Sequence, residues 1–392
     1  MKNKAALLVF FVIGIVILGS IVSANNSSSV VTSGWLKFLG ISYETEAPEG
    51  QFYDMVDESN NSITKTALPV HVGDEFWAAD NKHYRVTKVK NHTAYCKYVE
   101  TENIAWLDEW DDIPAATDIS VQTNKKANNV IAVYHTHSDE SYVPTDGRSS
   151  IRGRGGIFKV GDVFTEKMKS LGLDVYHDKT PHDPHDAGAY QRSRRTAVNL
   201  LKKQPAIAFD VHRDAVPAEV YESEVAGQNV TKIKMVVGRQ NQNKQANLEF
   251  AKTMKAAMDK THPGLFEGIF MARGNYNQDL GPRMMLIEVG SNENSREEAQ
   301  KGVALFADSV PKVLGVYQNK GSQNQFNQIA SPGVTRNKAG SWPALWWLLG
   351  IVVIGGGLFL FISTGSVGGG IKKLKEFSGS EWKNAFSKRK QK

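Results

Sequence analysis

The sequence predicts an α/β fold: a mixed sheet with helices on both faces, preceded by a small antiparallel β module and flanked by two transmembrane helices. From Val130 onward, apolar strand-like runs alternate with helix-like stretches, which indicates an α/β sheet. Residues 66–104 hold shorter alternating runs separated by turn residues, as in antiparallel strands. A long uncharged apolar stretch lies near each end of the chain. Together these observations place a folded body between two membrane segments.

The first apolar stretch, residues 5–24 (AALLVFFVIGIVILGSIVSA), follows Lys2 and Lys4 and contains no charge. A helix of this length matches a hydrocarbon core of roughly 30 Å at about 1.5 Å per residue. We therefore predict an uncleaved anchor. A cleaved signal peptide stays open as an alternative, because Val22-Ser23-Ala24 resembles a small-residue cleavage site.

The second apolar stretch, residues 342–362, begins with tryptophans of the kind that gather at membrane interfaces. The tail that follows, residues 363–392, is basic, with eight Lys or Arg against two Glu. Since positive charge flanks both spans on their outer termini, both termini are predicted to be cytoplasmic and residues 25–341 extracytoplasmic. The tail itself is either solvated or bound to the anionic inner leaflet.

Net charge and cysteine content exclude two classes of protein. The formal charge of +6 comes from the chain ends, because residues 5–370 carry 37 Lys or Arg against 39 Asp or Glu, a net charge of −2. The folded body therefore lacks the basic character expected for nucleic-acid binding. The single cysteine, Cys96, excludes an intrachain disulfide and a cysteine-rich zinc module.

The region between the membrane spans is predicted to contain five segments. They are a linker (25–65), the β module (66–104), a connector (105–129), the α/β domain (130–318) and a second linker (319–341). Within the α/β domain we expect strands at 130–134, 173–176, 206–211, 232–237 and 284–289. Helices are expected at 161–171, 188–203, 244–259 and 295–313. Ligands of such a sheet gather at the carboxyl ends of its strands.

Three predicted strand ends carry groups that bind metals. His135, His137 and Glu140 follow the first strand, His212 follows the third and Glu288 ends the last. A hydrolytic zinc site needs three protein ligands and a nearby carboxylate that accepts a proton from water. We predict His135, Glu140 and His212 as ligands and Glu288 as the base. His137 competes with His135 for ligation or lies in the surrounding shell. A polar loop and a structurally paired Glu288 are the plainer alternatives.

Other residues are candidates for substrate or metal binding on less specific patterns. Arg192 and Arg194 lie where a helix starts, and Arg213 follows His212, so these arginines are candidates for substrate binding. Arginines at a helix start are equally suited to structural pairing. A second group of histidines stands among aspartates and indicates either another metal site or a polar loop after a strand: His177, His182 and His185.

These motifs, taken together, resemble the stage II sporulation protein P family of endospore-forming bacteria. The resemblance rests on four segments in order across about 130–315: Tyr134-His-Thr-His-x-x-Glu-Ser-Tyr142, Tyr190-x-Arg-Ser-Arg194, Asp210-Val-His-Arg-Asp214 and Ile287-Glu-Val-Gly290 followed by Asn292. The catalytic part of the family is similar to zinc-dependent N-acetylmuramoyl-L-alanine amidases. The resemblance therefore implies an amidase-like fold, with His135, Glu140 and His212 matching the metal-binding pattern and Glu288 the catalytic glutamate. His137 belongs to the motif without an assigned role.

The resemblance also implies a function. The expected activity is release of stem peptides from glycan strands of peptidoglycan, with Zn²⁺ as cofactor, and the family is also associated with endopeptidase action on cross-links. Expected partners are peptidoglycan, the cytoplasmic membrane, and membrane proteins such as the stage II sporulation proteins D and M, with no nucleic acid. The predicted second span departs from the family pattern, so the sequence leaves open whether the process is sporulation. A zinc endopeptidase and a non-catalytic peptidoglycan-binding tether are the alternatives.

Overall fold

The structure is a computed structural model that describes residues 44, 46–48, 50–111, 128–186 and 188–321. Both predicted membrane spans and the basic tail lie outside these residues. Within the described part of the chain, no helix combines the length and apolar character needed to cross a bilayer.

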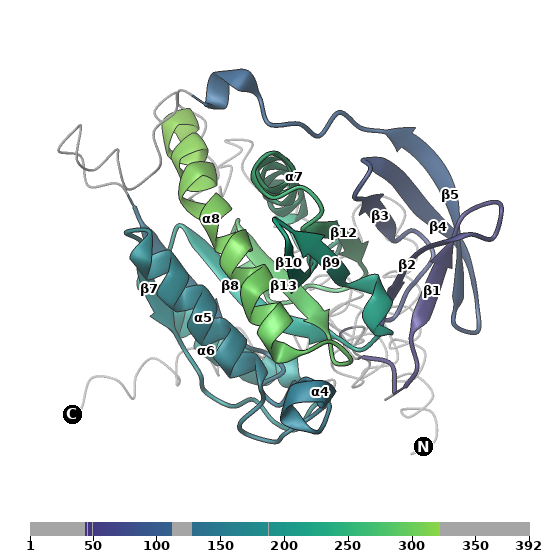
Figure 1. Cartoon of the computed structure of the whole chain (residues 1–392), viewed down its shortest axis with the longest axis horizontal. Helices are drawn as coiled ribbons and strands as arrows, with labels where there is room; N and C mark the ends of the chain where they lie inside the picture. The colour runs from purple at the N-terminus through teal and green to yellow at the C-terminus, as the bar shows by residue number, and fades with distance from the viewer. Residues whose placement is uncertain (1–43, 45, 49, 112–127, 187, 322–392) are drawn as a thin grey trace, which may run out of the picture. The chain divides into compact units, whose positions relative to one another are not determined.

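One mixed sheet organises the described residues (Figure 1). Its strands run in the order β2-β1-β5-β4-β3-β12-β11-β13-β8-β6-β7. Their bounds are β1 (Tyr53–Val56), β2 (Ser62–Thr66), β3 (Glu75–Ala78), β4 (Lys82–Lys90), β5 (Thr93–Thr101), β6 (Val130–Tyr134), β7 (Asp174–His177), β8 (Ile207–Asp214), β11 (Ile233–Gly238), β12 (Phe266–Ala272) and β13 (Met284–Ser291). A separate hairpin is formed by β9 (Glu222–Val225) and β10 (Gln228–Thr231).

The helices are α4 (Val143–Asp146), α5 (Ile157–Ser170), α6 (Ala189–Leu201), α7 (Lys244–Thr261) and α8 (Arg296–Gly321), with short 3-10 turns η2 (Asp108–Trp110), η3 (Ala218–Val220) and η4 (Gln278–Leu280). In Figure 1, α8 crosses the front of the sheet, with α5 on its left and α7 to the right of its upper part. The fold class is thus confirmed as a mixed α/β sheet with helices on both faces.

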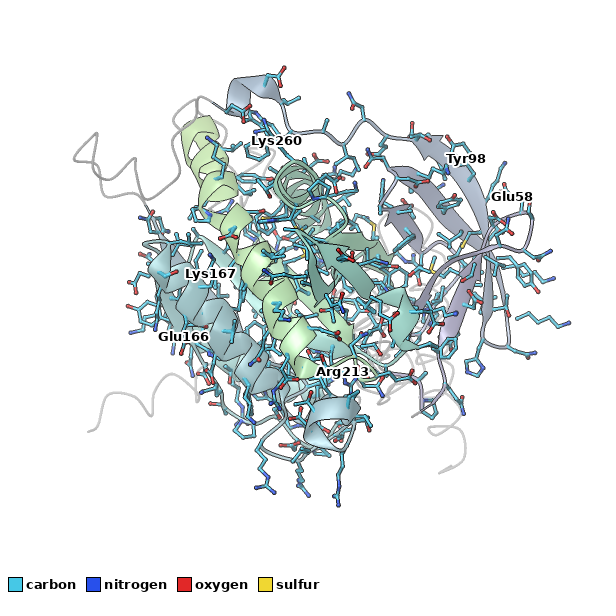
Figure 2. All side chains as sticks on the ribbon, in the orientation of Figure 1. Glu58, Tyr98, Glu166, Lys167, Arg213 and Lys260 are labelled. Carbon is cyan, nitrogen blue, oxygen red and sulfur yellow. The ribbon has the colours of Figure 1, made fainter. Side chains whose placement is uncertain are left out.

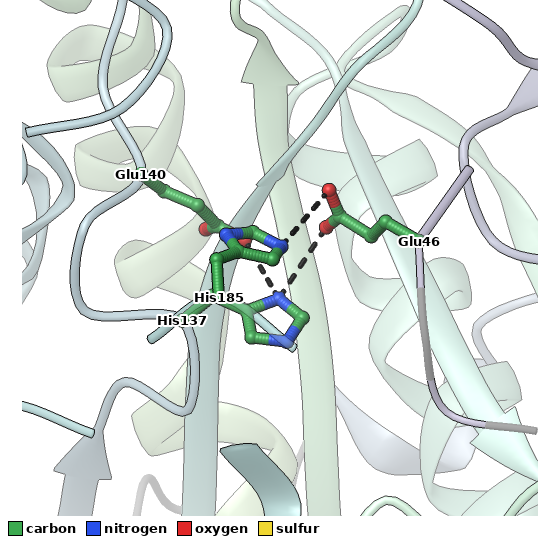
Figure 3. Close-up of side chains that lie close together, drawn as sticks. All are labelled: Glu46, His137, Glu140 and His185. Carbon is green, nitrogen blue, oxygen red and sulfur yellow. Dashed lines mark hydrogen bonds and ion pairs between the residues drawn. The ribbon is translucent and has the colours of Figure 1, made fainter. Parts of the chain in front are cut away.

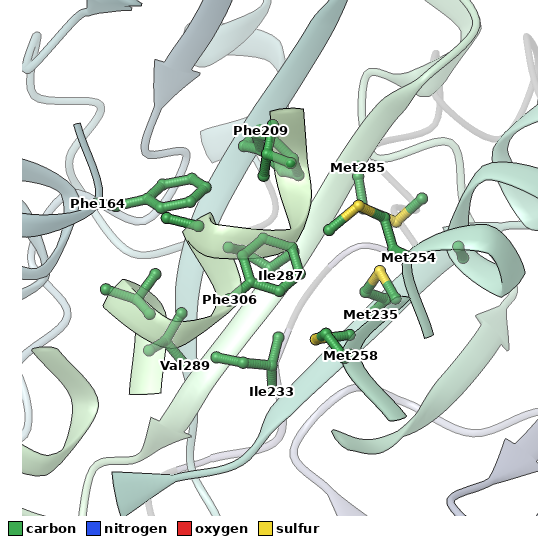
Figure 4. Close-up of a cluster of buried hydrophobic side chains, with 14 of the residues drawn as sticks. Phe164, Phe209, Ile233, Met235, Met254, Met258, Met285, Ile287, Val289 and Phe306 are labelled. Carbon is green, nitrogen blue, oxygen red and sulfur yellow. The ribbon is translucent and has the colours of Figure 1, made fainter. Parts of the chain in front are cut away.

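Strand alternation divides the apolar residues between the two faces. Phe209 and Ile287 pack with Phe164 of α5 and Phe306 of α8 in a core that also takes in α7 (Figure 4). On the other face, α6 packs on Ala132, Tyr134 and Ala208. Because successive side chains of a strand point to opposite faces, each strand contributes to both layers.

The β module is continuous with the α/β sheet. Strand β3 pairs antiparallel with β12, with Trp77 opposite Ile269. The apolar residues of the module, including Phe76 and Val86, pack with Val236 and Phe270 of the central strands. The β module and the α/β domain therefore share one sheet and one apolar core.

The structure corrects several predicted boundaries. Strand β1 and all of β2 except Thr66 fall within residues 25–65, for which we predicted a linker. The prediction failed because runs of four or five residues are too short to show a period. Strand β12 and the β9–β10 hairpin were not predicted. Helix α5 begins at Ile157, four residues before the predicted start, and α8 runs to Gly321.

Candidate metal centre and its surroundings

Three parallel neighbours, β6, β8 and β13, bring their carboxyl ends to one edge of the sheet. On β8, Asp210, His212 and Asp214 are alternate residues and lie on the face covered by α6. Asp210 marks this face, since it accepts hydrogen bonds from Thr136, which also contacts Ser193 of α6. Polar side chains at this edge are therefore placed by the strands themselves.

A compact cluster forms around the Glu140 carboxylate. Glu140 Oε1 lies 3.1 Å from His137 Nδ1 and 3.1 Å from His212 Nδ1, while Oε2 accepts a 2.9 Å hydrogen bond from the backbone N–H of Arg213. The three side chains are buried. Asp210 Oδ1 lies 2.9 Å from His212 Nε2, on the far side of that ring. Two imidazoles and a carboxylate thus converge from the loop after β6 and from β8.

Two further groups border this cluster (Figure 3). Glu46, from the segment before β1, places Oε1 3.4 Å from His137 Nδ1 and Oε2 3.3 Å from His185 Nε2. His185 stacks on His137 and meets Asp139 Oδ1 at 3.0 Å. Ligand atoms of Glu46, His137, Glu140 and His185 lie within 4.8 Å of one another.

His135, predicted as a ligand, lies on the other face of the sheet. Its Nδ1 donates to the carbonyl of Val211 at 2.9 Å, and its Nε2 lies 2.8 Å from His177 Nε2. The ring packs beneath α5, where Phe158 meets it edge-on and a Cβ on Gly161 would lie 2.6 Å from its Nε2. Both ring nitrogens are engaged away from Glu140. The structure therefore does not bring His135 to the cluster.

Glu288 lies on the strand next to His212, in direct register with it. On its other side it is in register with Lys234 of β11. The Glu288 side chain is 2 % exposed, and its Oε2 has no hydrogen-bond partner among the described residues. Burial, and next the Asp214 carboxylate, raise the pKa of Glu288 well above its usual range. Such a carboxyl group holds a proton more strongly than an exposed glutamate does.

The electrostatic environment of His212 is strongly anionic. Burial alone lowers the pKa of this imidazole, but the carboxylates of Asp210 and Glu140 outweigh it, and the pKa of His212 is well above its usual range. A site that attracts an extra proton in this way also attracts a divalent cation. Metal binding would then displace protons from the ligands.

The sequence profile of the Stage II sporulation protein P (SpoIIP) family matches residues 50–310 of the chain. The chain belongs to the SpoIIP family. It is similar to the stage II sporulation protein P of Bacillus subtilis (strain 168), with 29% identity over 235 residues, which are 54% of this chain and 59% of that protein. The match therefore spans less than two thirds of the curated relative.

Solved structures with a similar arrangement include two amidases. The N-acetylmuramyl-L-alanine amidase Ami1 from Mycobacterium smegmatis has 16% identity and a TM-score of 0.31, covering 50% of this chain and 97% of that one. An N-acetylmuramoyl-L-alanine amidase from Clostridium difficile 630 has 15% identity and a TM-score of 0.31, with the same coverage. These values are too low to support a conclusion about the activity of this chain.

Two arginines near the start of α6 form structural contacts. Arg192 donates from Nε to the carbonyl of His182 at 2.7 Å and from Nη2 to Asp186. Arg194 forms a two-pronged pair with Asp279, at 2.8 and 2.7 Å. These predicted substrate-binding arginines therefore hold neighbouring loops. Arg213 differs, since its Nε and Nη1 have no hydrogen-bond partner among the described residues.

Sequence reasoning missed Glu46 and gave His185 little weight. Glu46 lies outside the motifs and within a predicted linker, so no local pattern marks it. His185 carried a signal, as one of three histidines set among aspartates, but a polar loop was the simpler interpretation. His182 of that group is structural, because its ring nitrogens meet the carbonyl of His135 and the hydroxyl of Thr196.

Proposed function

We propose that this SpoIIP-family chain is a peptidoglycan hydrolase, a zinc-dependent N-acetylmuramoyl-L-alanine amidase that releases stem peptides from glycan strands. The observation that carries the proposal is the convergence of His137, Glu140 and His212 next to Glu288, a buried carboxyl group whose pKa is raised. Membership of the family supports the same substrate.

The donor set fits zinc. Two imidazoles and one carboxylate from different elements are a common set of zinc ligands. Here both Nδ1 atoms already face one oxygen of Glu140, and Asp210 stands behind His212 as a carboxylate that orients a metal-bound imidazole. We therefore assign His137, Glu140 and His212 as the ligands, with His137 in place of His135.

Zinc bound by these residues would polarise the scissile carbonyl and lower the pKa of a bound water. Glu288 would take the proton from that water and deliver it to the departing amine. Its buried position beside Asp214 suits this exchange, because a raised pKa makes the carboxylate a stronger base towards the water proton.

The setting is part of the proposal. The apolar stretches 5–24 and 342–362 would anchor the enzyme in the cell membrane with both termini cytoplasmic, so that the catalytic body faces the cell wall. Sporulation is the process that family membership favours, and the stage II sporulation proteins D and M are candidate partners.

The decisive experiment is digestion of purified peptidoglycan by the full-length chain in detergent with added zinc, followed by mass spectrometry of the products. Amidase action frees the lactoyl carboxylate of muramic acid and leaves a stem with a free alanine amine. Glu288→Gln should abolish this release, whereas Glu224→Gln, on the exposed hairpin strand β9, should not.

Two other results of this digestion would overturn the proposal. Cut cross-links on stems that remain attached to muramic acid would indicate an endopeptidase. No product from the intact chain would indicate that the domain binds peptidoglycan without cleaving it.

A further inference from the structure

A buried arginine with unused donors lies beside the proposed metal centre. Arg213 is 3 % exposed, and its Nη2 donates a hydrogen bond to the carbonyl of Ser149 at 3.1 Å. Its Nε and Nη1 have no hydrogen-bond partner among the described residues. A guanidinium group stays charged in proteins, and buried donors of such a group are costly to leave without acceptors. The side chain labelled in Figure 2 lies at the end of the sheet near α4.

Arg213 lines a cavity of about 370 Å³ at the mouth of the site. His137 and His185 form one part of its wall, and Ser149 and Ser150 another. The cavity therefore reaches from the proposed ligands to a permanent cation. Nη1 of that cation faces Glu46, which also lines the cavity.

A carboxylate of the chain itself lies in this cavity. Glu46 Oε2 is 3.6 Å from Arg213 Nη1, within ion-pair range but beyond a hydrogen bond, and its other neighbours are His137 and His185. Ala47 and Pro48 line the cavity beside it. The position suits a carboxylate, yet Glu46 does not bond the guanidinium directly.

We propose that this cavity is a carboxylate subsite, in which Arg213 binds a free carboxylate of the substrate next to the amide that is cleaved, and which Glu46 occupies when substrate is absent. The inference rests on the proposed function and deepens it by naming the substrate class. Stem peptides with a free carboxylate near the cleaved bond are bound in preference to the same peptides with a carboxamide. The planar guanidinium suits a two-point bond to a carboxylate, whereas a carboxamide offers a single acceptor oxygen and no charge.

The test compares two synthetic muramoyl peptides that differ only in a free carboxylate or a carboxamide on the residue after the scissile alanine. Affinities are measured by calorimetry with the full-length zinc-loaded chain carrying Glu288→Gln, so that no substrate is consumed. We expect the carboxylate peptide to bind about tenfold more tightly, which corresponds to about 1.4 kcal/mol.

Adding Arg213→Gln should bring the ratio of the two affinities close to one, and Arg213→Lys should leave an intermediate ratio. Arg195→Gln, at an exposed arginine of α6, is the matched control and should keep the full ratio. Retained zinc content and circular dichroism establish that Arg213→Gln is folded. A preference that survives in folded Arg213→Gln would overturn the proposal.

The variant Glu46→Gln tests whether Glu46 competes with the substrate carboxylate for Arg213 or instead binds the metal. If Glu46 occupies the subsite, Glu46→Gln should bind the carboxylate peptide several-fold more tightly and keep its zinc. Loss of zinc from this variant would make Glu46 a metal ligand and contradict the subsite. Failure of the proposed function is a different result, because it would show as no hydrolysis by the chain with Glu288 intact, whatever the binding ratio.

Discussion

His135 and His137 are two residues apart and lie in unlike surroundings. His135 is enclosed beneath α5, with its nitrogens on a backbone carbonyl and on His177. His137 lies on the opposite face of the sheet, with its Nδ1 between the carboxylates of Glu140 and Glu46. One imidazole is held by the fold, and the other is surrounded by groups that attract a cation.

The difference follows from where the strand ends. Ile131 and Val133 of β6 face the core under α5, and His135 continues their alternation. Thr136 continues the alternation of Ala132 and Tyr134 and is bonded to Asp210. Beyond Thr136 the chain turns away from the sheet. His137 therefore lies on the face opposite His135, although strict alternation would place both on the same face. The alternation of faces along β6 therefore holds as far as Thr136 and does not predict the face on which His137 lies.

The largest expected effect is the loss of metal from His137→Ala. With one of three proposed ligands removed, zinc content should fall from about one per chain to nearly none, and hydrolysis should fall by at least about 10³-fold. Elemental analysis after dialysis and a peptide-release assay provide the measurements. If His137→Ala kept its zinc while His135→Ala lost it, the assignment of the two imidazoles would be reversed.

His135→Ala should act more weakly, through position. It removes the hydrogen bond to the carbonyl of Val211, the residue that precedes His212, and leaves a cavity under α5. We expect zinc affinity to fall about 10- to 100-fold, as for residues that orient a ligand. Competition with a chelator measures this change. His135→Asn, which can still donate to Val211, should recover part of the affinity.

Gly161→Ala perturbs the packing around His135 and His177 beneath α5 without touching the proposed metal ligands. Alanine usually stabilises a helix relative to glycine by about 1 kcal/mol, but here its Cβ would lie 2.6 Å from His135 Nε2 and 2.9 Å from His177 Cε1. We expect a net loss of about 1–3 kcal/mol in the free energy of unfolding, measured by denaturant titration, with zinc content unchanged. Stabilisation by Gly161→Ala would show that the imidazole pair is loosely held.

The last prediction concerns the pH dependence of stability. Burial lowers the pKa of His177 to about 4, against about 6.5 when the chain is unfolded. The unfolded chain therefore binds more protons between these values, so the stabilisation is complete above about pH 6.5 and is lost as pH falls towards 4. About 1–3 kcal/mol of unfolding free energy should disappear across that window. The free energy of unfolding, measured by denaturant titration at several pH values, should depend less steeply on pH in His177→Gln than in the unsubstituted chain.

The sequence by itself determined the alternation of strands and helices from Val130, because apolar periods over five or more residues are local signals. It also determined that His137, Glu140, His212 and Glu288 lie at strand ends that share one edge. Residues 5–24 and 342–362 stay predictions as membrane spans.

Only the tertiary structure decided which groups meet. The sequence could not choose between His135 and His137, because the choice depends on where the chain turns away from β6. It could not reveal that Glu46 lies beside the cluster, since that contact joins residues about 90 positions apart. Nor could it separate Arg213 from Arg192 and Arg194, because the free donors of a guanidinium depend on which acceptors other segments bring to it. Residue type and period are properties of short stretches of chain, whereas these contacts follow from packing across the sheet.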